Sequence, residues 1–255
     1  QKMIAEISHH GRTFKVDLSK PLDLSIPIRS GTGHLRAWGV DPVRMEPVQN
    51  RDTIYAVQQG APVNFRNVFF NPHGHGTHTE CVGHISPIVH SVGSIFKRYF
   101  FTAQLLSIRP QDRRTEGQTV DNVITLEQLR SALSERPPEA LVLRTLPYVD
   151  HREHDWTGTN PPYIQASACS WLRSIGVKHL LLDLPSVDRE EDGGKLEAHH
   201  AFWGHPHTRD QESTITELIN VPTDIRDGNY LLEIQLANFV NDAAPSRPVL
   251  YAIIP

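Results

Sequence analysis

The sequence has little cysteine, no long apolar run and no excess of basic residues. Only two of its 255 residues are cysteines, Cys81 and Cys169, and two distant cysteines do not form the disulfide framework of a small secreted domain. Both are expected to be buried small apolar residues. No apolar run reaches the roughly 18 residues that a membrane span needs, and the first residues lack the apolar core of a secretory signal. We therefore expect a cytoplasmic protein that does not bind membranes.

The charge balance also excludes some classes of function. The formal net charge is −4, with 25 basic and 29 acidic residues, so the chain offers no basic footprint for nucleic acid. A G-x-S-x-G elbow is missing as well, which disfavours a Ser-His-Asp hydrolase. A hydrophobic content of 38% in 255 residues is enough for one substantial core. We expect a single domain over residues 1–255.

The most informative stretch is rich in histidine. Residues 71–84 read N-P-H-G-H-G-T-H-T-E-C-V-G-H and hold four of the 15 histidines of the chain together with one acid, Glu80. The stretch follows Val68–Phe70, an apolar run that predicts the end of a buried strand. If the chain stays extended, His78, Glu80 and His84 share a face, and the Cα atoms of His78 and Glu80 lie about 6–7 Å apart. Imidazole and carboxylate ligands without thiolate suit Zn²⁺, Mn²⁺ or Fe²⁺.

This stretch resembles the signature of the cyclase family of metal-dependent hydrolases, which includes bacterial kynurenine formamidase and isatin hydrolase. The signature is H-x-G-T-H-x-D-x-P-x-H. The chain keeps four of its residues: Gly76, Thr77, His78 and His84. It departs from the signature at three positions, where the first His, the Asp and the Pro are replaced by Gly74, Glu80 and Val82. Glu in place of Asp keeps the ligand atom on a side chain that is one methylene longer.

The missing first His leaves one ligand position open to two candidates, His73 and His75, which flank Gly74. A bulge at Gly74 could turn His73 towards the metal. His75 directly precedes the preserved Gly-Thr-His portion, which a distortion there would disturb. We therefore predict that His73 is the ligand and that His75 points towards the pocket rim or solvent.

The order of elements predicts an α/β fold. Thr125 and Gln128 form a capping box in front of a helix that ends before Pro137. A buried strand, Leu141–Leu143, follows, then a helix that opens at Asn160-Pro161 and a second buried strand, Val177–Leu184. This strand–helix–strand unit implies a parallel pair, and β-rich segments lie on both sides of it. We expect a mixed sheet with flanking helices, which fits the swivelling β/β/α architecture of the resembled family.

Further site residues lie beyond the second of these strands, where open sheets place their sites. The run from Asp183 to Asp188 matches a D-x-P-S-x-D element of the family. Two interpretations of Asp183 are open: an active-site acid or partner of a ligating His, and a cap of a turn. The resemblance implies that His199 and Glu217 bind metal, with His200 and Glu212 as weaker rivals. A Glu in an apolar strand is costly to bury without a cation.

The long irregular loop from Pro21 to Pro47 contains Trp38. Such loops are often lids or binding loops, and the equivalent region of the family covers the substrate pocket. Trp38 is therefore a candidate wall for an aromatic substrate, and ordinary packing is the alternative.

The resemblance implies a metal-dependent amidohydrolase of the arylformamidase type. One or two divalent ions, Zn²⁺ or Mn²⁺, would be held by five residues: His73, His78, Glu80, His199 and Glu217. The ions would activate water for attack on a formyl or lactam-type carbonyl, as in N-formylkynurenine, a compound of tryptophan catabolism. His84 would shuttle the proton to the leaving nitrogen, and a metal-ligand or structural role is its alternative.

Two rival functions remain open at this point. One is a cyclic amide or lactone hydrolase on the same site, because the substrate is selected by variable loops. The other is a metal-containing binding protein that has lost turnover, which the missing first His motivates. The resemblance also implies a homodimer or homotetramer that acts on a small molecule.

Overall fold

The computed structural model describes residues 1–114, 120–207 and 212–254. A strongly curved ten-stranded sheet dominates it, in the order β1-β2-β17-β16-β9-β12-β14-β15-β8 with β3 on β17. Because β17 also pairs with β8, the strands from β17 round to β8 close into a ring. The strands of this sheet have these bounds: β1 Ile4–His9, β2 Arg12–Asp17, β3 Leu22–Asp23, β8 His78–Glu80, β9 Phe100–Ile108, β12 Ala140–Thr145, β14 His179–Leu182, β15 Thr214–Glu217, β16 Gly228–Leu236 and β17 Ala243–Ile254.

The ring mixes parallel and antiparallel pairing. Strands β9, β12, β14 and β15 run parallel to one another, whereas β8, β16 and β17 pair antiparallel with their neighbours. A smaller sheet contains β10 Gln111–Arg114, β11 Val120–Ile124 and β13 Tyr163–Ile164. The mixed α/β prediction is confirmed, including the parallel pair of β12 and β14.

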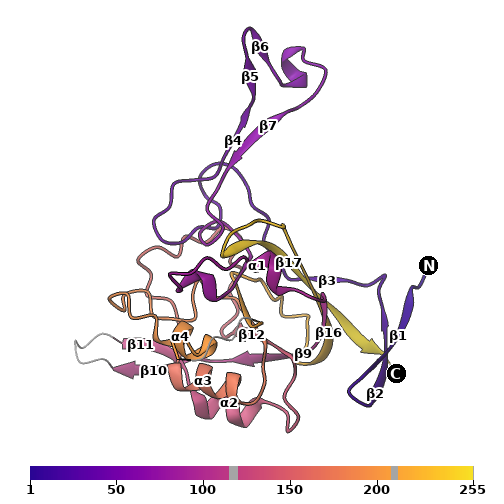
Figure 1. Ribbon diagram of the computed structural model, residues 1–255, viewed down its shortest axis with the longest axis vertical. Coiled ribbons are helices and arrows are strands. Elements are labelled where there is room, and N and C mark those ends of the chain that lie inside the picture. Colours follow the sequence, from indigo (N-terminus) through magenta and orange to yellow (C-terminus); the bar gives the residue numbers. More distant parts are fainter. Residues whose placement is uncertain (115–119, 208–211, 255) are drawn as a thin grey trace.

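Helices cover one side of the ring (Figure 1). They are α2 Leu126–Ala132, α3 Ala166–Ser174 and α4 Glu197–Trp203, with a short α1 Val92–Ile95 and the 3-10 turns η1 Val57–Gln59 and η2 Val82–His84 elsewhere. The capping box of Thr125 and Gln128 is present at the start of α2. Buried residues of α3 and α4 join those of β12, β14 and β15 in one hydrophobic core. None of the described helices is long and apolar enough to cross a membrane.

The second helix begins later than predicted. Asn160 adopts a left-handed conformation with φ 50° and starts no helix. The chain instead forms β13, which pairs parallel with β11, and α3 begins after Gln165. The prediction was wrong because Ile164 belongs to a strand whose backbone N–H donates to the carbonyl of Val187, a contact that no local pattern announces.

Two further stretches extend beyond the described residues. The charged run Gln111–Gly117 has the composition of a solvated loop, but it begins with the exposed strand β10, and its residues 115–117 lie outside the described part of the chain. The stretch from Trp203 to Gln211, for which the sequence predicts an extended loop, begins at the last residue of α4, and its residues 208–211 lie outside that part as well.

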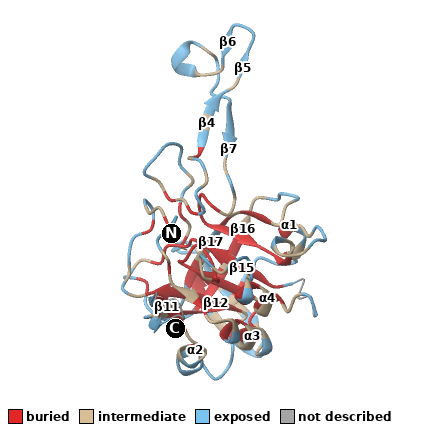
Figure 2. Cartoon of the chain, turned by 90° about the vertical axis from the view of Figure 1, so that its left-hand side faces the viewer, coloured by how far each residue is buried: buried red, intermediate tan, exposed pale blue. Residues whose placement is uncertain are grey.

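An arm projects from the body of the molecule (Figure 1). It contains β4 Arg44–Pro47 paired with β7 Arg66–Phe69, and β5 Gln49–Asn50 paired with β6 Thr53–Ile54. The prediction that Val68–Phe70 ends a buried strand was wrong, because β7 is exposed along its whole length and pairs only with β4 (Figure 2). The histidine-rich stretch therefore begins where the chain returns from this arm to the body.

Candidate metal centre

Two neighbouring strands supply the centre of the site. Strand β8 pairs antiparallel with β15, and Glu217 stands directly opposite His78 in this register. The His78 Nε2 atom lies 3.4 Å from Glu217 Oε2, and both side chains are buried. The alternation expected for an extended segment holds as far as Glu80, where β8 ends. Strand pairing thus brings together a His and a Glu that are 139 positions apart in sequence.

His199 approaches the same point from helix α4. Its Nε2 lies 3.0 Å from Glu80 Oε1 and 3.8 Å from Glu217 Oε1. The other ring nitrogen, Nδ1, lies 2.6 Å from Asp188 Oδ2, and Asp188 also accepts hydrogen bonds from the backbone N–H groups of Ala198 and His199. A carboxylate on Nδ1 is the arrangement that fixes the tautomer of a metal-binding His and leaves Nε2 for the metal. The rival His200 instead contacts the backbone carbonyl of His205.

A turn stabilised by Asn71 points His73 into the site. The Asn71 side-chain oxygen accepts hydrogen bonds from the backbone N–H groups of His73 and Gly74, which is an Asx turn. His73 Nδ1 then lies 3.2 Å from Glu80 Oε2, and Nε2 lies 3.0 Å from Asp242 Oδ2. The imidazole of His73 packs edge-on against that of His78 with ring centroids 5.1 Å apart.

Gly74 explains why the chain departs from the family signature at this position. A Cβ atom on Gly74 would lie 2.8 Å from Val40 Cγ2 and 3.2 Å from the carbonyl oxygen of Ala37. The Gly74 carbonyl also accepts a hydrogen bond from the backbone N–H of Ala37. The loop that contains Trp38 is therefore pressed against residue 74, and a His side chain does not fit there.

His75 does not point towards the rim or solvent, so that part of the prediction was wrong. It is buried, with 5% of its surface exposed. Its Nδ1 accepts a hydrogen bond from the backbone N–H of Asn71, and Nε2 donates to the carbonyl of Asp41. Both ring nitrogens are thus occupied by the backbone, and His75 supports the turn that carries His73.

His84 lies at the mouth of the cluster. It belongs to the 3-10 turn η2 rather than to a continued strand, and its side chain is 30% exposed. Its Nδ1 is 3.4 Å from Asp242 Oδ2 and 3.8 Å from Glu80 Oε2. The ring lies beside that of His73 with centroids 4.4 Å apart. His84 therefore joins the buried carboxylate of Glu80 to solvent.

Sequence reasoning missed Asp242, which bridges His73 and His84. Asp242 precedes β17, and the pairing of β17 with β8 places Ala243 opposite Glu80. No motif in the sequence marks this residue, because its position depends on the closure of the ring.

Two further candidates lie beside the cluster without a described contact to it. Both carboxylate oxygens of Asp183 accept hydrogen bonds from Thr145, one from the backbone N–H and one from the hydroxyl. Burial raises the pKa of Asp183 to about 6. Trp38 is 40% exposed, in the loop that contacts Gly74. Of the two acids in the D-x-P-S-x-D element, Asp188 contacts a His of the cluster, whereas no described contact joins Asp183 to one.

The carboxylates and imidazoles strongly perturb one another. Burial opposes the ionisation of Glu80, yet His84 and His199 hold the pKa of its carboxyl well below the usual range. Burial would lower the pKa of His73, but its hydrogen bond to Asp242 and the nearby carboxylate of Glu80 raise that pKa to about 10. In the same way Glu80 and Asp188 outweigh burial and raise the pKa of His199. Without a metal, protons on His73 and His199 therefore help to keep the carboxylate of Glu80 ionised.

Two buried atoms of the cluster have no hydrogen-bond partner among the described residues, His78 Nε2 and Glu80 Oε2. His73 Nδ1 approaches Glu80 Oε2 at 3.2 Å without the alignment of a hydrogen bond. The ligand atoms of His73, His78 and Glu80 lie within 4.8 Å of one another, and so do those of Glu80, His84 and His199. Unpaired buried atoms of this kind are costly, and they fit a divalent metal that accepts nitrogen and carboxylate ligands.

Comparison with known proteins assigns the chain to a family. Residues 16–189 match the Cyclase family model, which is described as "Putative cyclase". Because this match covers more than half of the sequence, the chain belongs to the cyclase family, and the resemblance seen in the histidine-rich stretch is confirmed. No curated protein matches the sequence.

Solved structures share the fold. A structure described as a "potential metal-dependent hydrolase with cyclase activity" superposes with a TM-score of 0.66 at 15% identity, covering 92% of this chain and 99% of the other. A structure described as a "predicted metal-dependent hydrolase from Bacillus stearothermophilus" gives a TM-score of 0.63 at 15% identity, covering 91% of this chain and 98% of the other. An isatin hydrolase bound to the product analogue thioisatinate gives 0.61 at 11% identity, covering 92% and 93%. The chain thus has the fold of the cyclase-family metal-dependent hydrolases.

Proposed function

We propose that this protein is a metal-dependent hydrolase that cleaves a C–N amide bond of a small aryl formamide or cyclic amide. The observation that carries the proposal is the convergence of His73, His78, Glu80, His199 and Glu217, with the buried atoms His78 Nε2 and Glu80 Oε2 left unpaired. A cluster with so many buried carboxylate oxygens needs cations to be stable. The family membership and the fold support the same reading.

A divalent ion held by these five residues would polarise a substrate carbonyl and lower the pKa of a water molecule. Asp188 holds the ring of His199 through Nδ1 and so orients Nε2 towards Glu80 and Glu217. The Asx turn of Asn71 holds the backbone N–H of His73 and so directs the His73 ring towards Glu80. The ligand geometry is therefore fixed by backbone and carboxylate contacts before any ion arrives.

His84 is the proton carrier in this proposal. It lies between the cluster and solvent, and Asp242 faces its Nδ1 at 3.4 Å. A base needs to reach the proton it moves, directly or through one water molecule. His84 can take a proton from water activated beside Glu80 and deliver it to the leaving nitrogen. Trp38, in the loop over Gly74, is the proposed wall for the aromatic part of the substrate.

Hydrolysis of N-formylkynurenine and of isatin by purified protein supplied with Zn²⁺ or Mn²⁺ tests the proposal. We expect metal-dependent turnover of at least one of them, and the ratio of the two kcat/KM values separates an open-chain formamide from a cyclic amide. The fold shared with isatin hydrolase motivates the second substrate. Metal uptake without turnover of any formamide, cyclic amide or lactone would instead support a metal-containing binding protein.

We also propose that the protein works as a homo-oligomer through its arm. Several apolar side chains of the arm are exposed in the single chain, among them Phe65 at 58%, Val68 at 49% and Phe69 at 45%. Exposed apolar residues gathered on one projecting element often mark a protein–protein contact. Sedimentation of wild type and of Phe65→Ser is the test, and an equal monomeric mass for both would exclude this role of the arm.

A further inference from the structure

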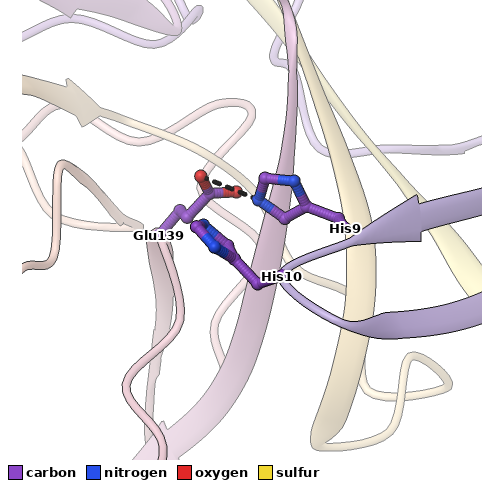
Figure 3. Close-up of side chains that lie close together, drawn as sticks. All are labelled: His9, His10 and Glu139. Carbon is purple, nitrogen blue, oxygen red and sulfur yellow. Dashed lines mark ion pairs between the residues drawn. The ribbon is translucent and has the colours of Figure 1, made fainter.

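We propose that His9, His10 and Glu139 form a second metal site, separate from the cluster described above, that takes a zinc-type divalent ion. Figure 3 shows the three side chains converging from the end of β1 and the residue that precedes β12. One ligand atom from each lies within 4.8 Å of the others.

The hairpin turn is what places two consecutive imidazoles on one side. Neighbouring residues of an extended strand point to opposite faces, so His9 and His10 would diverge if β1 continued. The strand ends at His9, and His10 and Gly11 both adopt left-handed conformations, with φ 47° and 73°. The two rings therefore lie close together in an edge-on contact, with centroids 4.1 Å apart. A non-glycine residue in this conformation is uncommon.

The spacing of the ligand atoms suits a tetrahedral ion. His9 Nε2 lies 3.2 Å from Glu139 Oε1. Two ligands about 2.0–2.1 Å from a tetrahedral Zn²⁺ are separated by about 3.3 Å. His9 Nε2 is also buried and makes no hydrogen bond to a described residue. The pair is thus spaced for one shared ion, and a ligand atom of His10 lies within 4.8 Å of both.

Glu139 is kept ionised by its other neighbours, as a metal ligand must be. Its Oε2 accepts hydrogen bonds from the backbone N–H and the hydroxyl of Thr102, and Arg98 contacts both carboxylate oxygens. Burial would raise the pKa of Glu139, but Arg98 and Thr102 outweigh it and bring that pKa to about 2. Arg98 competes with a cation for Oε1, yet its side chain is 51% exposed and can move aside while Thr102 still holds Oε2.

The two sites lie at opposite ends of the parallel strands. Glu217 is the last residue of β15, whereas Glu139 immediately precedes β12, which is parallel to β14 and β15. His9, His10 and Glu139 line a pocket of about 990 Å³ that also contains Arg12 and Arg136. Three protein ligands beside an open pocket leave a fourth position for water or a small anion, as in zinc sites that keep one exchangeable ligand.

An ion at this site would join the β1–β2 hairpin to the strands of the ring. The hairpin is also attached through the pairing of β2 with the end of β17, through an apolar cluster with Leu231 and Tyr251, and through a hydrogen bond from Arg136 to the carbonyl of His10. A ligand that binds the folded state adds RT ln(1 + [L]/Kd) to its stability. Zinc should therefore stabilise the protein through the hairpin in addition to any effect at the first site.

Calorimetric titration of the tag-free chain with Zn²⁺ tests the proposal, together with zinc per chain after dialysis. His10→Asn is the informative variant, because Asn tolerates the left-handed conformation of the turn and removes the imidazole. His207→Asn is the matched control, since His207 is exposed and belongs to no group of described residues that could hold a metal.

We expect wild type and His207→Asn to bind one more zinc ion per chain than His10→Asn. If His10→Asn still binds this ion, we expect its affinity to fall by more than the roughly 10–100-fold that is lost with a residue that only supports a ligand. His10→Asn should melt at the wild-type temperature without zinc and gain less when zinc is added. Identical stoichiometry and affinity in all three proteins would overturn the proposal. His10→Asn leaves the first cluster unchanged. If the first cluster binds no zinc, that ion will be missing from wild type and from both variants, so a failure of the first site is distinguishable from a failure of the second.

Discussion

Two groups of His and Glu residues lie at opposite ends of the parallel strands. They differ in what balances the negative charge of their carboxylates. Glu139 is held by Arg98 and Thr102, so its charge is balanced within the protein. Glu80 and Glu217 are buried, and the ion pairs of both among the described residues are all with histidines. One group is stable as it stands, whereas the other reaches charge balance only by holding protons or a metal.

This contrast separates a carboxylate that is balanced by protein groups without a metal from carboxylates that depend on an exchangeable cation. Burying a charge costs several kcal/mol unless it is paired, and Arg is the usual partner where the role is structural because it is always charged. Histidine gives up its proton to a metal near neutral pH. A buried Glu surrounded by His is thus an exchangeable site, and metal removal should affect the first cluster much more than the second.

The largest effect is expected from removing a central ligand. His78→Ala and Glu217→Ala each leave the opposite partner buried without its pair, so both variants should lose bound metal and hydrolysis together. Elemental analysis and an activity assay on the same preparation are the measurements. Retention of full metal content by either variant would remove that residue from the ligand set.

Replacing His84 should separate turnover from metal binding. His84→Asn keeps a polar side chain at the mouth of the cluster and removes the proton carrier, so we expect normal metal content and a kcat lower by about 10²–10⁴-fold. If His84→Asn loses the metal instead, His84 is a ligand and another group moves the proton.

His73 and His75 are expected to differ in whether their replacement lowers metal content or stability, with smaller effects than at His78 and Glu217. His73→Ala should lower metal content, because its ring faces Glu80 and Asp242. His75→Ala removes two hydrogen bonds to the backbone and should retain metal while reducing stability by about 1–3 kcal/mol. Metal content and denaturant midpoints measured side by side decide the matter. The assignment is reversed if His75→Ala loses metal and His73→Ala does not.

The smallest effect is expected at Glu139, and it depends on pH. The pKa of Glu139 falls from its ordinary value of 4.5 to about 2 in the folded protein. A depressed pKa contributes stability above pH 4.5 that is lost as the pH falls towards 2. Glu139→Gln should therefore melt below wild type at neutral pH, and the difference should shrink over that acidic window. A gap that stays constant with pH would show that the charge of Glu139 contributes nothing.

Much of the candidate site could be predicted because its residues carry local signals. His78 and Glu80 belong to an alternating segment, and Glu217 is an acid at the end of a strand of β-type residues. Asp242 could not be predicted, since it reaches His73 only through the pairing of β17 with β8. The role of His75 was missed for the same reason, because its partner is the carbonyl of Asp41 in a distant loop.

The fold shows the same division. The capping box at Thr125 and the parallel pair of β12 and β14 follow from sequence pattern. The apolar run Val68–Phe70 has the pattern of a buried strand, yet it lies on the projecting arm. Periodicity reports which residues avoid water, and it does not report whether the protein's own core or another surface covers them.

The metal dependence of thermal stability tests the central claim most directly. Tag-free protein is analysed for metals, stripped with a chelator and melted before and after addition of Zn²⁺ or Mn²⁺. We predict at least one divalent ion per chain, a lower melting temperature after stripping and recovery on reloading, since an ion present at 100 times its Kd adds about 2.7 kcal/mol to folding. Protein that holds no metal, and that melts at the same temperature with and without it, would contradict the account.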